Sequence, residues 1–264
     1  MTTTDARSHR PDLTIVVPTY NECQQLDSLL EQVFSACDGQ GLVVELIIVD
    51  DNSADGTGDR ADDWARRRRV RVIHRAGRLG LGSAVIAGVA IAEGDIVGVM
   101  DADLSHPPGL VPALFSTMCG ADLDMVIASR YIRGGGTASW SIVRRMLSRL
   151  ACWMARPLTP VRDPMSGFFL IRRERLVGLH DPARGFKIGL DLLVRSKPRR
   201  VAEVAYVFVG RTGGKSKLNI GEGLRFLRQL IGLYRLPIVR PSHVMASIGS
   251  DWSQPASAAG RRRG

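Results

Sequence analysis

The 264-residue chain has only four cysteines, and their spacing excludes the common cysteine frameworks. Cys23, Cys37, Cys119 and Cys152 include no C-x-x-C pair, so neither a zinc site nor a redox motif is indicated. The first twelve residues are polar, and we expect them to be flexible and to carry no secretory signal. Isolated thiols without such a signal indicate a reducing, cytoplasmic compartment.

The sequence also lacks long apolar runs and has few aromatic residues. It contains no stretch of eighteen uncharged apolar residues, so we expect no transmembrane helix. Aromatic residues make up 6% of the chain, and few lie among the basic ones, which argues against a stacking surface for single-stranded nucleic acid. No G-x-G-x-x-G follows the first expected strand, which disfavours a nicotinamide enzyme.

Charge of one sign is nearly absent from parts of the chain, although the net charge is +10. Residues 12–63 hold twelve acidic side chains and one basic side chain, Arg60. Residues 126–162 hold seven arginines and no acid, and residues 223–240 hold four arginines and no acid. A basic second half suits nucleic acid, an anionic membrane or phosphorylated substrates.

Short apolar segments alternate with helical patterns through the first hundred residues. Strands are expected over residues 13–18, 43–49, 70–74 and 96–100, and helices over residues 22–36, 58–68 and 82–93. Continuous apolar strands are typical of a parallel sheet buried on both faces. The alternation predicts an α/β fold with a mostly parallel, doubly wound sheet and helices on both faces.

Polar residues follow three of these strands, where such sheets bind ligands. They are Pro18-Thr19-Tyr20-Asn21-Glu22, Asp50-Asp51-Asn52-Ser53 and Asp101-Ala102-Asp103. The spacing of Asp101 and Asp103 lets both carboxylates share one divalent cation with a diphosphate, as Mg²⁺ and Mn²⁺ require. A lone D-x-D is also common in solvated turns, so the other strand ends carry much of the argument. Clustered acids there disfavour a nucleic-acid binder.

Seven ordered motifs carry a more specific resemblance. The chain resembles the inverting family 2 glycosyltransferases of the GT-A (Rossmann-like) fold, and among them the dolichol-phosphate (polyprenol-phosphate) mannosyltransferases. The motifs are Val17-Pro18-Thr19-Tyr20-Asn21-Glu22; Val49-Asp50-Asp51-Asn52-Ser53 with Asp55-Gly56-Thr57; Arg78-Leu79-Gly80-Leu81-Gly82; Asp101-Ala102-Asp103-Leu104-Ser105-His106-Pro107; Ser129-Arg130-Tyr131; Asp163-Pro164-Met165-Ser166-Gly167-Phe168-Phe169; and Arg211 with Gly214 and Ser216-Lys217-Leu218.

The resemblance implies a role for individual residues. The nucleoside and donor side would be bound by Pro18, Tyr20, Glu22, Val49, Asp51 and Arg78. Diphosphate and Mg²⁺ or Mn²⁺ would be bound by Asp101, Ala102 and Asp103, with Ser105 as a third metal contact, directly or through water. Phosphates of donor and acceptor would be held by Arg130, Arg211 and Lys217, which complete the catalytic set with the two aspartates. Acceptor-side candidates are Arg144, Asp163, Ser166 and Ser216.

Some of these residues have a simpler reading. Asp163 could be only a helix N-cap, and Arg130 a surface residue at a strand end. His74, His106 and His180 have no metal-binding spacing and are expected to be structural or exposed.

The chemistry of sugar transfer agrees with this residue set. A divalent cation stabilises charge that grows on the leaving diphosphate, and arginine matches phosphate oxygens. A lipid monophosphate acceptor is already ionised at neutral pH, so transfer to it needs no general base. Positioning of the acceptor by cations then becomes the main requirement.

Two basic amphipathic segments, residues 140–156 and 224–239, are typical of helices that lie on an anionic membrane. They could equally be surface helices that pack on the chain's own core. We expect a flexible N-terminus (1–12), a GT-A domain (13–218), an amphipathic membrane-surface helix (219–241) and a disordered tail (242–264). The protein would be peripheral on the cytosolic face of a membrane, alone or with an accessory membrane subunit.

The predicted reaction is transfer of mannose from GDP-mannose to a polyprenyl (dolichyl) phosphate, which gives a β-linked product. Another donor such as UDP-glucose stays open, because nothing in the residues distinguishes guanine from uracil. A non-catalytic nucleotide-sugar-binding or membrane-peripheral scaffold is the alternative of another class. Retention of Asp101, Asp103, Arg211 and Lys217 argues against the scaffold.

Overall fold

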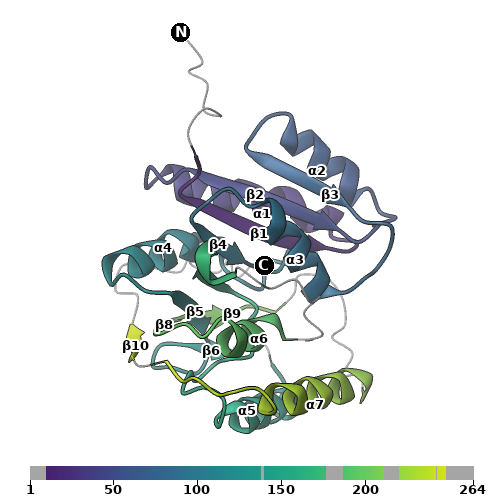
Figure 1. The fold of residues 1–264 in the computed structure, drawn as a ribbon. Helices are drawn as coiled ribbons and strands as arrows, with labels where there is room; N and C mark the ends of the chain where they lie inside the picture. The colour runs from purple at the N-terminus through teal and green to yellow at the C-terminus, as the bar shows by residue number, and fades with distance from the viewer. Residues whose placement is uncertain (1–9, 138–139, 177–186, 211–219, 242, 248–264) are drawn as a thin grey trace, which may run out of the picture.

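The computed structural model describes residues 10–137, 140–176, 187–210, 220–241 and 243–247. Within these residues the fold is one large sheet covered by helices (Figure 1). The large sheet has the order β10-β8-β5-β7-β4-β1-β2-β3. Its strands are β1 Leu13–Thr19, β2 Val44–Asp50, β3 Val70–His74, β4 Ile96–Val99, β5 Met125–Ser129, β7 Phe169–Arg172, β8 Arg200–Ala205 and β10 His243–Ser247. The expected α/β fold with a mostly parallel sheet is confirmed.

One strand runs against the others. β7 is antiparallel to both β4 and β5, whereas the remaining pairs of this sheet are parallel. The carboxyl ends of β1, β2, β4, β5 and β8 therefore meet at one edge of the sheet. A small parallel pair, β6 Gly136–Thr137 with β9 Val207–Phe208, lies beyond that edge.

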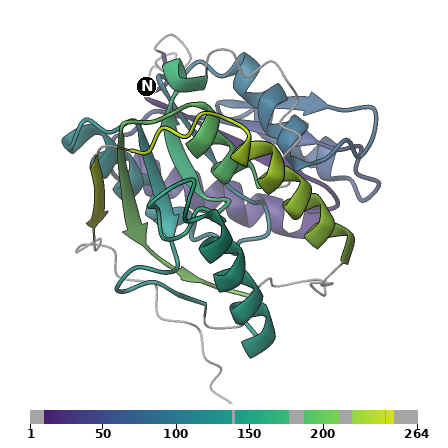
Figure 2. The same cartoon turned by 60° about the horizontal axis from the view of Figure 1, so that its bottom comes forward.

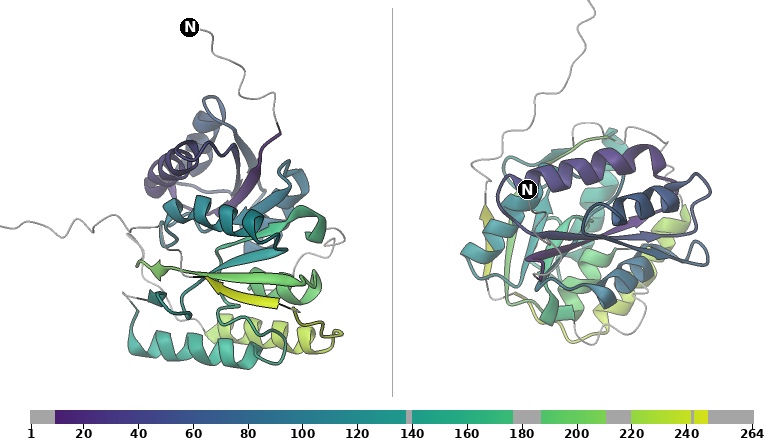
Figure 3. Two further views of the ribbon diagram at one scale, coloured as in Figure 1. Left: turned by 90° about the vertical axis from the view of Figure 1, so that its left-hand side faces the viewer. Right: turned by 90° about the horizontal axis from the view of Figure 1, so that it is seen from above.

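Helices cover both faces of the sheet. α1 Cys23–Asp38, α2 Thr57–Ala65 and α4 Val111–Gly120 contribute to the apolar cluster on one face. α3 Leu81–Ile91 and α6 Ile188–Arg195 contribute to the cluster on the other. Two short 3₁₀ helices, η1 Pro108–Leu110 and η2 Arg173–Leu176, complete the connections. Figure 3 shows these layers from the side and from above.

Small residues allow α3 to approach the sheet closely. A Cβ added at Gly88 would lie 2.4 Å from a methyl carbon of Val16 on β1. This is well inside van der Waals contact, so only glycine fits there. The close approach places the turn before α3, which contains Gly80, against the carboxyl ends of β1 and β2.

The last two long helices lie side by side at one end of the molecule. α5 Ile142–Ala155 and α7 Ile220–Tyr234 share a third apolar cluster with α6, and Figure 2 shows both on the near side of the molecule. α7 begins and ends earlier than the predicted helix at 224–239. Its earlier end agrees with Pro237, because a proline disfavours helical backbone at the residue before it. No helix in the described ranges combines the length and apolar character needed to cross a bilayer.

The expectation of a disordered tail from residue 242 is wrong over His243–Ser247. These residues form β10, which pairs in parallel with β8. An edge strand such as β8 offers unpaired backbone groups to any segment that can extend beside it. Residues 1–9 and 248–264, which belong to the expected flexible ends, lie outside the described residues.

Candidate active site

The two carboxylates of the D-x-D motif emerge where β4 ends. Asp103 is buried, and its Oδ1 accepts hydrogen bonds from the backbone N–H and the hydroxyl of Ser105 at 3.0 and 2.5 Å. Between them Leu104 adopts a φ of +59°, an uncommon backbone conformation for a residue with a large side chain. The turn at Leu104 therefore fixes the Asp103 carboxylate.

The side chain of His106 binds the backbone of Asp101, the other aspartate of the motif. The N–H of Asp101 donates to Nδ1 of His106 at 3.1 Å, and Nε2 lies 3.8 Å from Oδ2 of Asp101. Burial lowers the pKa of His106, although the charges of Asp101 and Asp103 oppose the shift. Because Nδ1 accepts the Asp101 N–H, the proton of the neutral imidazole lies on Nε2. It stacks on Phe168 at a centroid separation of 5.2 Å.

A divalent cation fits these groups. The Asp101 side chain is 36% exposed, and Gly167 leaves room beside it, because a Cβ there would lie 3.6 Å from both carboxylate oxygens. In the described part of the chain, no group of three or more His, Cys, Asp or Glu side chains could hold a metal ion. Two carboxylates completed by water and substrate phosphates are the usual arrangement for Mg²⁺.

Asp51 lies at the same edge, paired with an arginine that the sequence analysis missed. Arg75 donates from Nη1 to Oδ1 of Asp51 at 2.6 Å, and both side chains are buried. The backbone N–H of Gly80 also donates to Asp51, at 3.3 Å. Arg75 directly follows β3, so the rule that strand ends converge could have identified it.

The remaining donor-side predictions fall in different environments. Arg78 places its guanidinium 4.6 Å from the ring centroid of the exposed Tyr20. Pro18 is half-buried, and Glu22 donates its backbone N–H to Thr57. The Val49 side chain is fully buried in the core, so only its backbone could face a nucleoside. These nucleoside contacts stay predictions.

Arg130 follows β5 and forms a buried ion pair. Its Nε and Nη2 donate to the two carboxylate oxygens of Asp163, each at 2.7 Å, and its backbone N–H donates to the same group at 2.9 Å. Burial alone would lower the pKa of Arg130, but the carboxylate of Asp163 outweighs this and raises it. The guanidinium of Arg130 therefore stays charged within the pair.

Glu203 on β8 supports the loop that carries Asp163. Its carboxylate accepts the backbone N–H groups of Arg162 and Asp163 at 2.9 and 3.0 Å. Burial raises the pKa of Glu203. Asp163 thus holds Arg130, and neither the helix N-cap reading of Asp163 nor the surface reading of Arg130 is correct: no described helix begins at Asp163, and Arg130 is buried. Contact between Asp163 and an acceptor stays a prediction.

Aromatic side chains connect the carboxylates to the arginines. The ring centroid of Phe208 lies 6.1 Å from that of His106 and 5.2 Å from that of Trp140. The guanidinium carbons of Arg130 and Arg144 lie 5.0 and 4.1 Å from the Trp140 centroid. A continuous wall therefore runs from Asp101 to the two arginines.

The other candidates are either buried or fall outside the described residues. Ala102 and Ser166 are buried, and Oγ of Ser166 accepts the backbone N–H of Phe168 at 3.3 Å. Arg211, Ser216 and Lys217 lie outside the described residues.

Known proteins resemble this chain in sequence and in fold. Residues 14–191 match the family described as Glycosyl transferase family 2. A dolichol-phosphate mannosyltransferase of Pyrococcus furiosus is 38% identical over 85% of this chain and 63% of its own length. The dolichol-phosphate mannosyltransferase of Saccharomyces cerevisiae is also 38% identical, over 84% of this chain and 87% of its own.

A solved structure shares the fold. The mannosyltransferase from Pyrobaculum calidifontis in complex with GDP-Man and Mn²⁺ matches with a TM-score of 0.59 and 19% identity, over 86% of this chain and 64% of that one. The resemblance inferred from the motifs is confirmed. The chain belongs to glycosyl transferase family 2, and within it the chain is similar to the dolichol-phosphate mannosyltransferases.

Proposed function

We propose that the chain transfers mannose from GDP-mannose to the phosphate of a polyprenyl phosphate, with inversion to a β-linked product. The observation that carries this proposal is the wall of contacts from Asp101 through His106, Phe208 and Trp140 to Arg144. It joins two carboxylates suited to a metal-bound diphosphate with cations suited to a second phosphate. The names of the two relatives support the choice of sugar and acceptor.

On the donor side, Asp101 and Asp103 would hold Mg²⁺ or Mn²⁺, with Ser105 as a neighbour that already orients Asp103. The bound cation would stabilise negative charge on the leaving diphosphate. Tyr20, Asp51 and Arg78 would contact the nucleoside, and Arg211 and Lys217 would contact phosphates. The Pyrobaculum structure, which holds GDP-Man and Mn²⁺, supports this assignment of donor and metal.

On the acceptor side, Arg130 and Arg144 would position the lipid phosphate. The lone pair on Nδ1 of His106 is used by the N–H of Asp101, so this histidine is not available as a base. An ionised phosphate oxygen is itself the nucleophile and needs no proton removed. Catalysis then depends on alignment and on charge stabilisation.

The lipid end of the acceptor requires contact with a membrane, and we propose α5 and α7 as the docking surface. Their exposed apolar side chains are Ile142, Val143, Met146, Leu147, Leu150, Trp153, Leu224, Leu227, Ile231 and Tyr234. Arginines on the same helices would contact anionic lipid. The protein would sit on the cytosolic face of its membrane. Flotation of the purified chain with anionic vesicles tests this, and failure to float would favour an accessory membrane subunit.

The donor is tested by a thermal-shift panel of GDP-mannose, UDP-glucose and UDP-N-acetylglucosamine with Mn²⁺. A ligand that binds only the folded state raises stability by about 2.7 kcal/mol at a hundredfold excess over its Kd. GDP-mannose should raise the unfolding temperature most. A larger shift with UDP-glucose would mean that UDP-glucose, and not GDP-mannose, is the donor. No shift with any nucleotide sugar would favour a non-catalytic scaffold.

A further inference from the structure

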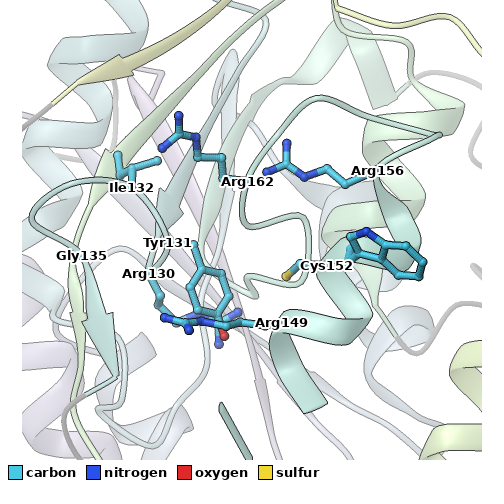
Figure 4. A pocket seen from close by; sticks show the side chains of 9 residues that line it. Arg130, Tyr131, Ile132, Gly135, Arg149, Cys152, Arg156 and Arg162 are labelled. Carbon is cyan, nitrogen blue, oxygen red and sulfur yellow. The ribbon is translucent and has the colours of Figure 1, made fainter. Parts of the chain in front are cut away.

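A basic pocket beside α5 shares only Arg130 with the acceptor side proposed above. It has a volume of about 560 Å³. Arg149, Trp153 and Arg156 line it from α5 and the residue that follows, and Tyr131 and Arg162 line it from two loops. Figure 4 shows Arg156 and Arg162 on one side of the space and Arg149 with Tyr131 on the other. The cations thus surround a common cavity.

Three cations of this pocket, Arg149, Arg156 and Arg162, have no acidic partner in the described part of the chain. Arg149 and Arg162 form no ion pair or side-chain hydrogen bond there, and Arg156 donates to the carbonyl oxygen of Pro160 at 3.1 Å. The adjacent carboxylate, Asp163, is fully buried and bound to Arg130. Three guanidinium groups around one space attract an anion, and phosphate oxygens match their donors.

The pocket is distinct from the place proposed for the reacting phosphates. Arg144, the acceptor-side cation, packs on Trp140 and Phe208 and does not line the pocket. Arg130 lines it but is held by Asp163. A group bound between Arg149, Arg156 and Arg162 would therefore need no contact with Arg144 or Trp140, since neither lines the pocket.

The pocket opens beside the apolar surface of α5. Trp153, which lines it, is 70% exposed. Leu150 and Met146, both exposed, continue the apolar surface along α5 away from the pocket. A ligand with a phosphate head and acyl chains could place the phosphate among the arginines and the chains along these residues.

We propose that this pocket binds the phosphate of an anionic glycerophospholipid of the membrane, as an anchor that does not react. The proposal rests on the membrane docking proposed above, and adds a defined lipid site to it. Diffuse attraction between basic residues and an anionic surface needs no saturable site. A built pocket instead predicts saturable binding of single lipid molecules.

The test uses the full chain and monomeric dihexanoyl phosphatidylglycerol, followed by tryptophan fluorescence. The chain has four tryptophans, and Trp153→Phe should remove the change in fluorescence that the lipid causes. We expect saturable binding that is at least about tenfold weaker in the triple variant Arg149→Gln/Arg156→Gln/Arg162→Gln. Equal binding by the triple variant, or no saturation in the wild type, would overturn the proposal.

A matched triple variant, Arg225→Gln/Arg228→Gln/Arg235→Gln, removes the same charge from α7 and the residue that follows it, outside the pocket. It should weaken binding to anionic vesicles but leave binding of the monomeric lipid unchanged. Equal losses in both triple variants would mean diffuse attraction and would refute the site. If inorganic phosphate binds the wild type as tightly as the lipid does, the pocket is a free-phosphate site and the lipid assignment is wrong.

The thermal shift with GDP-mannose separates this proposal from the proposed function. The pocket variant should keep the full shift, because none of its three side chains belongs to the donor site. A normal shift without lipid binding in the wild type would reject the pocket and leave the transferase proposal intact. Lipid binding by the wild type without a thermal shift from any of the nucleotide sugars would reject the transferase proposal and leave the pocket.

Discussion

Helices α1 and α5 have similar lengths and are both amphipathic, but they treat their apolar side chains differently. α1 buries Leu26, Leu29, Leu30, Val33 and Phe34 against the sheet. α5 buries only Cys152 and Ala155, and leaves Ile142 and Trp153 72% and 70% exposed. The first helix finds its apolar partner within the chain. The second leaves most of its large apolar side chains exposed among the described residues.

The charged groups near these helices show the same contrast. In the N-terminal half, Asp51 and Asp103 are bound by Arg75 and Ser105. In the second half, Arg149 and Arg162 have no ion pair among the described residues. The donor side is thus preorganised by internal contacts, whereas the side near α5 exposes both apolar and cationic groups. This combination is the reason for the proposal that α5 docks on an anionic membrane.

The largest expected effect comes from breaking the buried ion pair between Arg130 and Asp163. Asp163→Ala leaves Arg130 charged and buried without its partner, which should cost about 3–5 kcal/mol of unfolding free energy. Urea denaturation measures the loss. Asp95→Ala is the control, because Asp95 belongs to exposed pairs with Arg10 and Arg173 and should lose at most about 1 kcal/mol. Equal losses would mean that burial of the Arg130 pair is unimportant.

Two leucine-to-alanine substitutions, one on each helix, test the comparison of α1 and α5 directly. Leu29→Ala on α1 removes a fully buried side chain and should destabilise the fold by about 2–5 kcal/mol. Leu147→Ala on α5 removes an exposed one and should change stability by less than about 0.5 kcal/mol. Vesicle flotation should show the reverse order, with Leu147→Ala weaker and Leu29→Ala unchanged at a temperature where it is folded. A strong loss of stability in Leu147→Ala would mean that α5 packs on the protein itself.

Asp103→Ala should separate catalysis from membrane binding. Loss of this carboxylate should lower kcat by roughly 10²–10³-fold, the usual effect of removing one group that stabilises transition-state charge. Flotation with vesicles should stay unchanged. Glu31→Ala, an exposed acid on α1, serves as the control and should keep full activity. Metal-dependent turnover at the wild-type rate in Asp103→Ala would refute its role.

The smallest expected effect is an acid sensitivity that arises at His106. The pKa of His106 is lowered in the folded state, so below pH ~6.5 the unfolded chain binds a proton that the folded chain does not. The free energy of unfolding therefore decreases as the pH is lowered. The full contribution is present above that pH. The slope from this single group is at most about 1.4 kcal/mol per pH unit.

Unfolding of the metal-free chain between pH 5 and 7 measures this slope. His106→Asn keeps an acceptor near the Asp101 N–H but cannot be protonated, so its curve should be flatter than that of the wild type. His74→Asn, at an exposed histidine, should keep the wild-type slope. Identical slopes for wild type and His106→Asn would contradict the assignment.

The sequence predicted the strands and helices of the first hundred residues and the edge where those strands deliver functional groups, because parallel strands share one carboxyl edge. Asp51, Asp101 and Arg130 all emerge there. It did not predict which side chains bind one another: Arg75 lies 24 residues from Asp51, and Asp163 lies 33 residues from Arg130. Such pairs depend on loop conformation. The strand at His243–Ser247 was missed because a free edge of β8, and not local composition, specifies it.

The most direct test of the central claim is transfer itself. Purified chain with Mn²⁺, radiolabelled GDP-mannose and a polyprenyl phosphate should move label into the organic phase, and omission of the metal or of the lipid phosphate should abolish the transfer. Label that stays in the aqueous phase under complete conditions, with no binding of GDP-mannose by calorimetry, would contradict the account.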